Sequence, residues 1–140
     1  MRYQNPAATA TIIFERDGKI LLIRRKHEPY KGMLALPGGF NEYGKETLER
    51  TAQRESGEEL HLRLKQRDLY LLCVNSSPRR DPRGPTIDHV YVALEFQGEP
   101  RADDDAAEYE WRSPDTIKRL AFDHAKNIPK YLEWRKKNGR

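Results

Sequence analysis

Residues 38–62 hold the feature that most restricts the fold, a pair of glycines followed by a segment crowded with acidic side chains. If residues 46–60 form a helix, Glu55, Glu58 and Glu59 stand at positions i, i+3 and i+4 and share one face. Like charges at these spacings repel each other, so a helix that only faces water has little reason to collect them. A hard divalent cation such as Mg²⁺ supplies a reason, because it binds oxygen ligands and is shared between carboxylates and substrate phosphates. The segment therefore indicates a metal-binding helix, with a solvent-exposed helix laced by Arg–Glu pairs as the alternative.

The same segment resembles the Nudix box, G-x5-E-x7-R-E-U-x-E-E-x-G-U, in which U is a bulky aliphatic residue. The charged positions of the box are matched in order by Glu46, Arg54, Glu55, Glu58 and Glu59. Seven residues separate the first two of these, as in the box. The resemblance continues from about residue 9 to residue 124 and implies an α/β fold, a Nudix-type α/β/α sandwich with a mixed β-sheet.

The chain also departs from the box. One extra residue, assigned to Lys45, lies in the loop, so that Phe40 stands where the box has glycine. Ser56 replaces an aliphatic residue and His61 the closing glycine. Gly57 costs about 1 kcal/mol relative to alanine inside a helix. None of these changes removes a carboxylate, so we expect the chemistry of the box to be retained.

The resemblance implies a metal-dependent pyrophosphohydrolase and a role for each residue of the box. Glu55 and Glu59 are expected to be the main ligands of Mg²⁺, with Mn²⁺ as the alternative, and the Gly38 carbonyl to complete the coordination. Glu58 is expected to bind a second ion or to activate its water. Arg54 is expected to orient Glu55 through a charge-assisted hydrogen bond.

Two groups of titratable residues lie outside the box. The resemblance implies a catalytic base on a later loop, for which Asp104, Asp105 and Glu108 are the candidates and Glu108 is favoured. The alternative for this loop is a solvated acidic turn. His89 and His124 are single histidines, which we interpret as structural.

Downstream segments resemble those of ADP-ribose pyrophosphatase-like Nudix proteins, in which a D-P-R-G-H-T run precedes a strand. Here the run has Pro85 in place of the histidine. The expected reaction is hydrolysis of ADP-ribose to AMP and ribose 5-phosphate. The alternatives are a nucleoside triphosphate, capped RNA or a dinucleoside polyphosphate as substrate, or a module that binds a nucleotide without hydrolysing it. The substrate-binding residues are predicted to be Arg24, Arg25, Gly39, Phe40 and Arg83.

Composition narrows the class of protein and its partners. The 140 residues contain one cysteine, which excludes an intrachain disulfide and fits a reducing compartment, so we expect a cytoplasmic protein. The net charge is +4, but the basic residues form short separate clusters, so we do not expect a nucleic-acid partner. No apolar run reaches the length of a membrane span, and no signal-peptide hydrophobic region is present, so no membrane association is expected. We expect one domain over residues 1–140, and the resemblance implies a homodimer.

Apolar periodicity and turn residues predict the remaining elements. Asp17-Gly18 predicts a hairpin between the first two strands. Ser113 is predicted to begin one helix and Asp123 to cap the last one, which Pro129 is expected to bend or to end early. Strands are predicted at residues 7–14, 19–25, 33–36, 66–74, 86–96 and 109–111.

Overall fold

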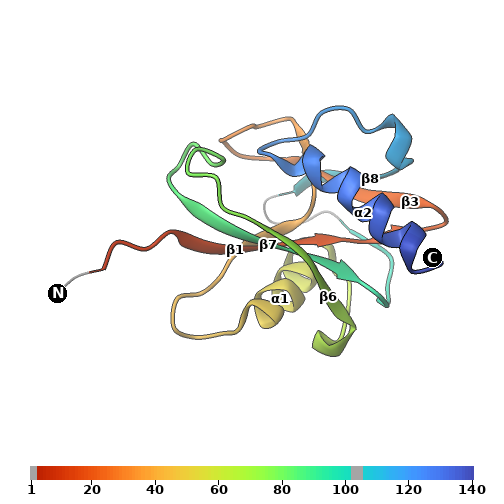
Figure 1. Ribbon diagram of the computed structural model, residues 1–140, viewed down its shortest axis with the longest axis horizontal. Coiled ribbons are helices and arrows are strands. Elements are labelled where there is room, and N and C mark those ends of the chain that lie inside the picture. Colours follow the sequence, from red (N-terminus) through yellow and green to blue (C-terminus); the bar gives the residue numbers. More distant parts are fainter. Residues whose placement is uncertain (1–2, 102–105) are drawn as a thin grey trace.

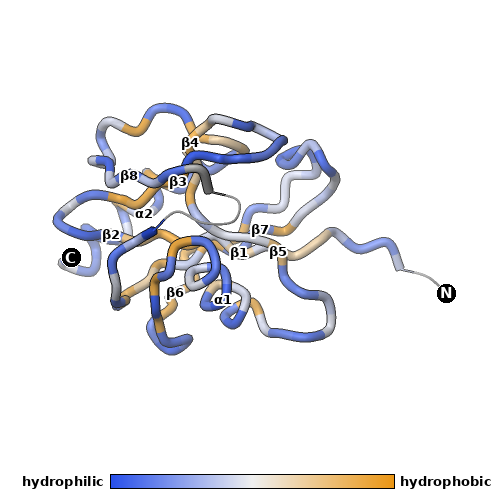
Figure 2. Tube along the Cα trace, turned by 180° about the vertical axis from the view of Figure 1, so that it is seen from behind, coloured by the Kyte–Doolittle hydropathy of each residue, from blue (hydrophilic) through white to orange (hydrophobic). Residues whose placement is uncertain are grey.

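The structure is a computed structural model that describes residues 3–101 and 106–140 (Figure 1). Within these residues the chain forms two four-stranded sheets and two α-helices, α1 (Leu48–Leu60) and α2 (Asn127–Lys137). In the described part of the chain, no helix is long and apolar enough to cross a membrane. The trace coloured by hydropathy shows that the outer loops are largely hydrophilic (Figure 2).

The first sheet is mixed and carries the glycine pair at its edge. Its strands follow the order β5, β1, β7, β6. The central pair β1–β7 is parallel, and the two outer pairs are antiparallel. The parallel pairing places Thr9 opposite Asp88, two residues that are 79 positions apart in the sequence. The bounds of the strands are Gly38–Phe40 for β5, Ala7–Ile13 for β1, Thr86–Ala93 for β7 and Leu69–Asn75 for β6.

The second sheet is antiparallel and is built around β3 (Lys19–Arg25). This strand forms a hairpin with β2 (Glu15–Arg16) through the predicted Asp17-Gly18 turn and also pairs with β4 (Leu34–Ala35) and β8 (Ala106–Arg112). The predicted hairpin partner, β1, instead pairs with β5 and β7 in the first sheet. Its central residues are fully buried, as the apolar run KILLIRR predicts.

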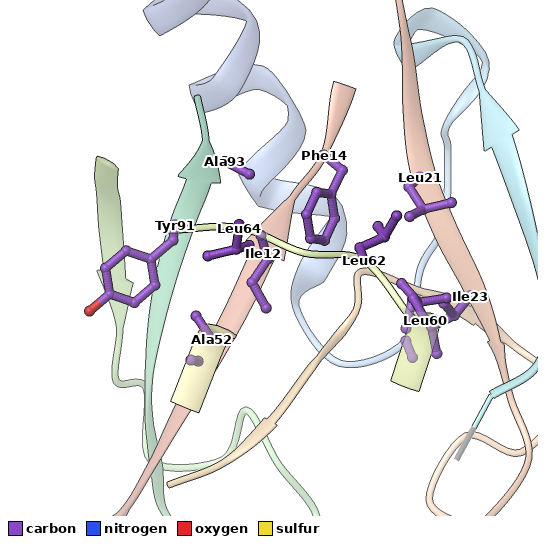
Figure 3. Close-up of a cluster of buried hydrophobic side chains, with 13 residues drawn as sticks. Ile12, Phe14, Leu21, Ile23, Ala52, Leu60, Leu62, Leu64, Tyr91 and Ala93 are labelled. Carbon is purple, nitrogen blue, oxygen red and sulfur yellow. The ribbon is translucent and has the colours of Figure 1, made fainter. Parts of the chain in front are cut away.

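Two hydrophobic clusters cover opposite faces of the sheets. Alternate residues of β1 point to opposite sides, so Ile12 belongs to the cluster with α1 and Ile13 to the cluster with α2. Ala52 and Leu60 are the buried apolar residues of α1 in the first cluster (Figure 3). Tyr131 packs α2 into the second. This arrangement is the predicted α/β sandwich, and the prediction is confirmed, with the strands divided between two sheets.

The C-terminal helix corrects two predictions. Pro129 neither ends α2 nor limits it to a short segment, because it occupies the first turn, where its missing N–H has no partner to lose. Asp123 does not cap a helix with its side chain, because its carboxylate accepts hydrogen bonds from Arg80.

Several predicted boundaries also differ from the structure. Thr47 is the N-cap of α1, so the helix begins at Leu48. The segment after Ser113 forms only a short 3-10 helix, Pro114–Thr116. Residues 66–68 form another such turn before β6, β7 ends at Ala93, and β8 is longer than the predicted residues 109–111.

Candidate active site

The box helix α1 has well-defined caps at both ends. The Thr47 hydroxyl accepts the Arg50 N–H at 3.1 Å, which satisfies one of the free donors of the first turn. His61 ends the helix in the left-handed region with a φ of 60°, and its N–H donates to the Gly57 carbonyl at 3.0 Å. The helix therefore extends past Gly57 and presents all its box carboxylates despite the replacement of the closing glycine.

Edge strand β5 runs alongside two of these carboxylates. The Gly38 N–H donates to Glu59 Oε1 at 3.3 Å. A Cβ on Gly39 would lie 2.4 to 2.7 Å from the carboxyl atoms of Glu55, so only glycine leaves the Glu55 carboxylate in this position. A Cβ on Gly38 would lie 2.1 Å from the Ala10 carbonyl oxygen. The glycine pair thus brings the backbone of β5 directly against the acidic face of α1.

Arg54 joins the loop before the helix to the carboxylates on the helix. It donates to Glu55 Oε1 at 2.9 Å and to Glu58 Oε2 at 3.1 Å. The same guanidinium donates to the Phe40 carbonyl at 3.0 Å and lies 2.9 Å from Glu46 Oε1. Burial raises the pKa of the Glu46 carboxyl, but the hydrogen bond and charge of Arg54 outweigh it and hold this pKa below its ordinary value. Arg54 is therefore fixed by several partners, and it fixes Glu55 in turn.

The donor set fits a hard divalent cation. Carboxylate and backbone carbonyl oxygens are the ligands that such ions take, and the missing Cβ of Gly39 leaves room for the Glu55 carboxylate against the β5 backbone. Glu58 is 53% exposed and points to solvent from its contact with Arg54. Among residues 3–101 and 106–140, no three His, Cys, Asp or Glu side chains already converge as a metal site. Glu55, Glu58 and Glu59 share one face of α1, while Glu58 is paired with Arg54.

An open pocket borders the same edge strand. Its cavity volume is about 60 Å³, which is smaller than a usual ligand pocket and has room for only part of a nucleotide. The structure brings four of the five predicted substrate-binding residues together in its lining: Arg25, Gly39, Phe40 and Arg83. The pocket is also lined by Gly38, Thr9, Ala10, Thr11, Leu36, Arg80, Asp81, Asp88, Phe122 and His124.

The rim of the pocket combines cations with aromatic rings. The Arg83 guanidinium carbon lies 4.7 Å from the centroid of the Phe40 ring and 5.5 Å from that of Phe122. Arg25 lies 4.9 Å from the centroid of Phe122. Arg83 also pairs with the buried Asp81 at 2.9 Å, yet its side chain stays 43% exposed. These contacts orient two positive charges toward the pocket.

The floor of the pocket is a buried polar network that the sequence did not indicate. Asp88 is 1% exposed and accepts hydrogen bonds from Thr9 at 2.8 Å and from Thr11 at 2.8 and 2.9 Å. Arg80 donates to Asp123 at 2.7 Å and lies 3.5 Å from Asp88. Burial raises the pKa of Asp123, but the hydrogen bond and charge of Arg80 outweigh it and lower this pKa. The parallel pairing of β1 with β7 brings Thr9 and Thr11 to Asp88.

The remaining predicted residues lie apart from the pocket lining. Arg24 forms an ion pair with Glu108 across the β3–β8 pair and donates to the Gly32 carbonyl at 2.7 Å. Glu108 is exposed at the start of β8. Asp104 and Asp105 lie outside the described residues. The later-loop base therefore stays a prediction.

Comparisons with known sequences identify the family. The NUDIX domain model matches residues 4–134 of the chain. The ADP-ribose pyrophosphatase of Methanocaldococcus jannaschii is 48% identical over 137 residues, a match that covers 98% of this chain and 78% of that protein.

Solved structures share the fold. The chain is similar to a MutT/nudix family protein from Enterococcus faecalis with a TM-score of 0.85 and 28% identity, over 98% of this chain and 64% of that one. It is similar to a bifunctional NMN adenylyltransferase/ADP ribose pyrophosphatase from Francisella tularensis complexed with AMP and Mn ion, with a TM-score of 0.79 and 31% identity, over 96% of this chain and 43% of that one. The NUDIX domain of Shewanella oneidensis NrtR complexed with ADP ribose matches with a TM-score of 0.80 and 26% identity, over 94% of this chain and 90% of that one. The chain thus spans less than two thirds of the first two proteins. With the box carboxylates on α1, the glycine pair beside them and a family match over most of its length, the chain belongs to the Nudix hydrolase family.

Proposed function

We propose that the protein hydrolyses the pyrophosphate bond of ADP-ribose and releases AMP and ribose 5-phosphate. The observation that carries this proposal is the position of the Glu55 carboxylate against Gly39, at the border of a pocket lined by cations and aromatic rings. The substrate is supported by the 48% identical ADP-ribose pyrophosphatase of M. jannaschii and by the similar NrtR domain complexed with ADP ribose.

Nudix hydrolases generally use divalent metal ions, and for this chain we propose Mg²⁺, with Mn²⁺ as the alternative. Glu55 and Glu59 are the proposed main ligands, with the Gly38 carbonyl and Glu58 as further oxygen donors. When bound, the ion neutralises phosphate charge and lowers the pKa of a water that it holds. This assignment is supported by the close approach of Gly39 to the Glu55 carboxylate and by the hydrogen bond from the Gly38 N–H to Glu59.

The chain supplies orientation and proton transfer. Arg54 positions Glu55 through its hydrogen bond and is itself held by Glu46, so the carboxylate does not need to be ordered during the reaction. Among the described residues, Glu58 and Glu108 are the candidates for the base that takes the proton of the attacking water. Both are exposed, and each is paired with an arginine. Replacing each by glutamine and comparing the pH dependence of kcat identifies the base, because only its variant loses the acidic limb of the profile.

Arg25, Arg83 and Phe40 are the proposed contacts of the nucleotide. The two guanidinium groups suit the diphosphate, and the exposed face of Phe40 suits stacking on a planar base. Arg24 keeps its predicted role in substrate binding, and it lies beside Glu108 at the β3–β8 pair. Replacing Arg24 and Arg25 one at a time shows which of them contacts the substrate. The loss of a substrate contact raises KM more than it changes kcat.

The proposal is tested by measuring product release from ADP-ribose, NADH, nucleoside triphosphates, capped RNA and dinucleoside polyphosphates. AMP release from ADP-ribose with Mg²⁺ is the expected result. Turnover of another compound alone would keep the site and reject the substrate. Metal-dependent nucleotide binding without any turnover would reject the enzyme and favour a binding module, the alternative that the departures at Ser56, Gly57 and His61 suggest.

We also propose a single domain that works as a cytoplasmic homodimer with no nucleic-acid partner. The apolar side chains of Tyr70, Leu71 and Val74 are exposed on edge strand β6 and support an association of two copies. Light scattering of the purified protein tests the dimer, for which a mass near twice 16.4 kDa is expected.

A further inference from the structure

His124 lies at the floor of the pocket, and its ring is held in one tautomer. The side chain is 7% exposed and lines the pocket. The backbone N–H of Leu36 donates to its Nδ1 at 3.1 Å. A backbone amide can only donate, so Nδ1 must be the unprotonated nitrogen, and in the neutral ring the proton sits on Nε2.

The surroundings keep this ring neutral. Burial lowers the pKa of His124. The charges around it partly cancel, because Asp88 and Asp123 raise this pKa while Arg80 and Arg25 lower it. A proton on Nδ1 would also point at the Leu36 N–H, so that two hydrogen-bond donors would face each other. The ring therefore presents one donor, the Nε2–H group.

The Nε2–H group has no hydrogen-bond partner among residues 3–101 and 106–140. In the described part of the chain, Asn127 Nδ2 is the single fully buried side-chain nitrogen or oxygen atom that makes no hydrogen bond. A His124 Nε2 atom without a hydrogen bond is therefore not fully buried. The hydrogen bond of the His124 ring to the described residues is the one at Nδ1. Nε2 therefore keeps its access to the pocket that His124 lines, and a donor at this position is available to a ligand.

The charges around His124 select the kind of acceptor. Asp88 and Asp123 bring two carboxylates near the ring, and Arg80 and Arg25 bring two guanidinium groups, so these charges compensate each other. The neutral Nε2–H group carries no charge to attract a phosphoryl oxygen, and the exposed Arg83 at the rim suits that oxygen better. An uncharged acceptor fits the floor, which is the chemistry of a ribose hydroxyl or of a ring nitrogen of a base.

We propose that His124 is a specificity-determining residue, whose Nε2–H donates a hydrogen bond to an uncharged acceptor on the nucleoside part of the ligand. This inference rests on the proposed function, since it takes AMP to be the product that the pocket holds. The sequence indicated a structural role for His124, whereas this proposal gives it a role in substrate recognition.

Two variants separate the two nitrogen atoms of the ring. In His124→Asn the side-chain oxygen keeps an acceptor near the position of Nδ1 for the Leu36 N–H, and the donor at the position of Nε2 is lost. In His124→Gln the distal amide keeps a donor, and the acceptor for Leu36 is lost. We expect His124→Asn to melt near the wild-type temperature and to bind AMP about five- to tenfold more weakly in Mg²⁺, measured by calorimetry. His124→Gln is expected to melt lower and to bind AMP closer to wild type.

The control is His27→Asn, which changes an exposed loop histidine and is expected to leave AMP affinity unchanged. Ribose 5-phosphate is the second ligand. If His124→Asn weakens both ligands, the acceptor is a ribose hydroxyl, and if it weakens AMP alone, the acceptor is on the base. Equal affinity of His124→Asn and wild type for both ligands would overturn the inference.

A measurement on the wild-type protein tests the same point without a variant. ¹⁵N-histidine NMR is expected to show Nε2–H in the free protein and a shift of the Nε2 signal when AMP is added. An Nδ1–H tautomer, or an Nε2 signal that neither ligand moves, would reject the inference. Failure to hydrolyse ADP-ribose with these AMP effects intact would overturn the proposed function alone, and no binding of either ligand would overturn both.

Discussion

The Cα of Gly39 lies so close to the carboxylate of Glu55 that a Cβ would come within 2.4 Å of the Glu55 Cδ. The atoms in the way are the end of the Glu55 side chain, which can shift without moving the backbone but then loses its hydrogen bond from Arg54. We therefore expect Gly39→Ala to fold normally and to lose about 100-fold in kcat, because the displaced carboxylate no longer meets the metal in its productive position. Steady-state kinetics with ADP-ribose and a thermal melt measure the two effects.

Gly38→Ala is the matched comparison, one residue earlier on the same strand. Its Cβ would lie 2.1 Å from the Ala10 carbonyl oxygen, which belongs to the paired strand β1 and cannot swing aside. We expect this variant to lose about 1 to 3 kcal/mol in the free energy of unfolding. A Gly39→Ala enzyme with full activity would show that the close approach to Glu55 has no role in catalysis.

Arg54→Lys tests the positioning of Glu55. Lysine keeps the charge but cannot contact Glu46, Glu55 and the Phe40 carbonyl at once, as the guanidinium does. We expect kcat to fall about 10- to 100-fold and the apparent affinity for Mg²⁺ to weaken. Arg50→Lys is the control on the same helix, because Arg50 is exposed and contacts Gln53. Equal kcat values for the two variants would contradict the role given to Arg54.

The Arg80–Asp123 pair predicts how stability depends on pH. The pKa of Asp123 is lowered in the folded protein, so its ionised form stabilises the fold above about pH 4, the ordinary pKa of the unfolded chain. This stabilisation is lost as the pH falls through the folded pKa, and Asp81 acts in the same direction. We expect the free energy of unfolding, from urea titrations, to fall between pH 5 and pH 3.

Asp123→Asn checks this assignment. The variant is expected to lose about 3 kcal/mol at pH 7, because Arg80 keeps its charge while one of its partners is neutral. Its stability is expected to change less between pH 5 and pH 3 than that of the wild type. Parallel pH profiles for the two proteins would place the acid sensitivity elsewhere.

Gly57→Ala tests whether a departure from the box has a purpose. A Cβ at this position would have only the Leu62 carbonyl oxygen near it, at 3.9 Å, which is ordinary van der Waals contact. Alanine is the better helix former, so we expect a gain of about 0.5 to 1 kcal/mol in the free energy of unfolding and unchanged activity. A loss of stability would mean that the helix needs the glycine for a reason that its contacts do not explain.

The features that the sequence predicted correctly depend on residues that are close together in the chain. The carboxylates of α1 share a face because their spacing matches the helical period. The strands with strong apolar patterns form close to the predicted residues. The pocket floor depends on distant pairs. Thr11 meets Asp88 across 77 residues through a parallel strand pairing that no local pattern reveals.

Local signals also failed where a tertiary contact or a position within the helix decided the outcome. Pro129 is a helix breaker only in a helix interior, and its place in the first turn of α2 depends on where the chain begins that helix. Aspartate is a favoured residue at an N-cap, but the carboxylate of Asp123 accepts a hydrogen bond from Arg80 instead. His124 looked structural because the sequence could not show that its Nδ1 is bonded and its Nε2 is open to a pocket.

The central claim is that the box carboxylates carry metal-dependent hydrolysis of ADP-ribose. The most direct measurement is AMP release from ADP-ribose across a Mg²⁺ titration for wild type, Glu59→Gln and Glu133→Gln, an exposed position on α2 that pairs with Lys137. We predict that AMP release needs Mg²⁺, stops with chelator, falls at least about 100-fold in Glu59→Gln and is unchanged in Glu133→Gln. AMP release at the wild-type rate from Glu59→Gln, or in the presence of chelator, would contradict the account.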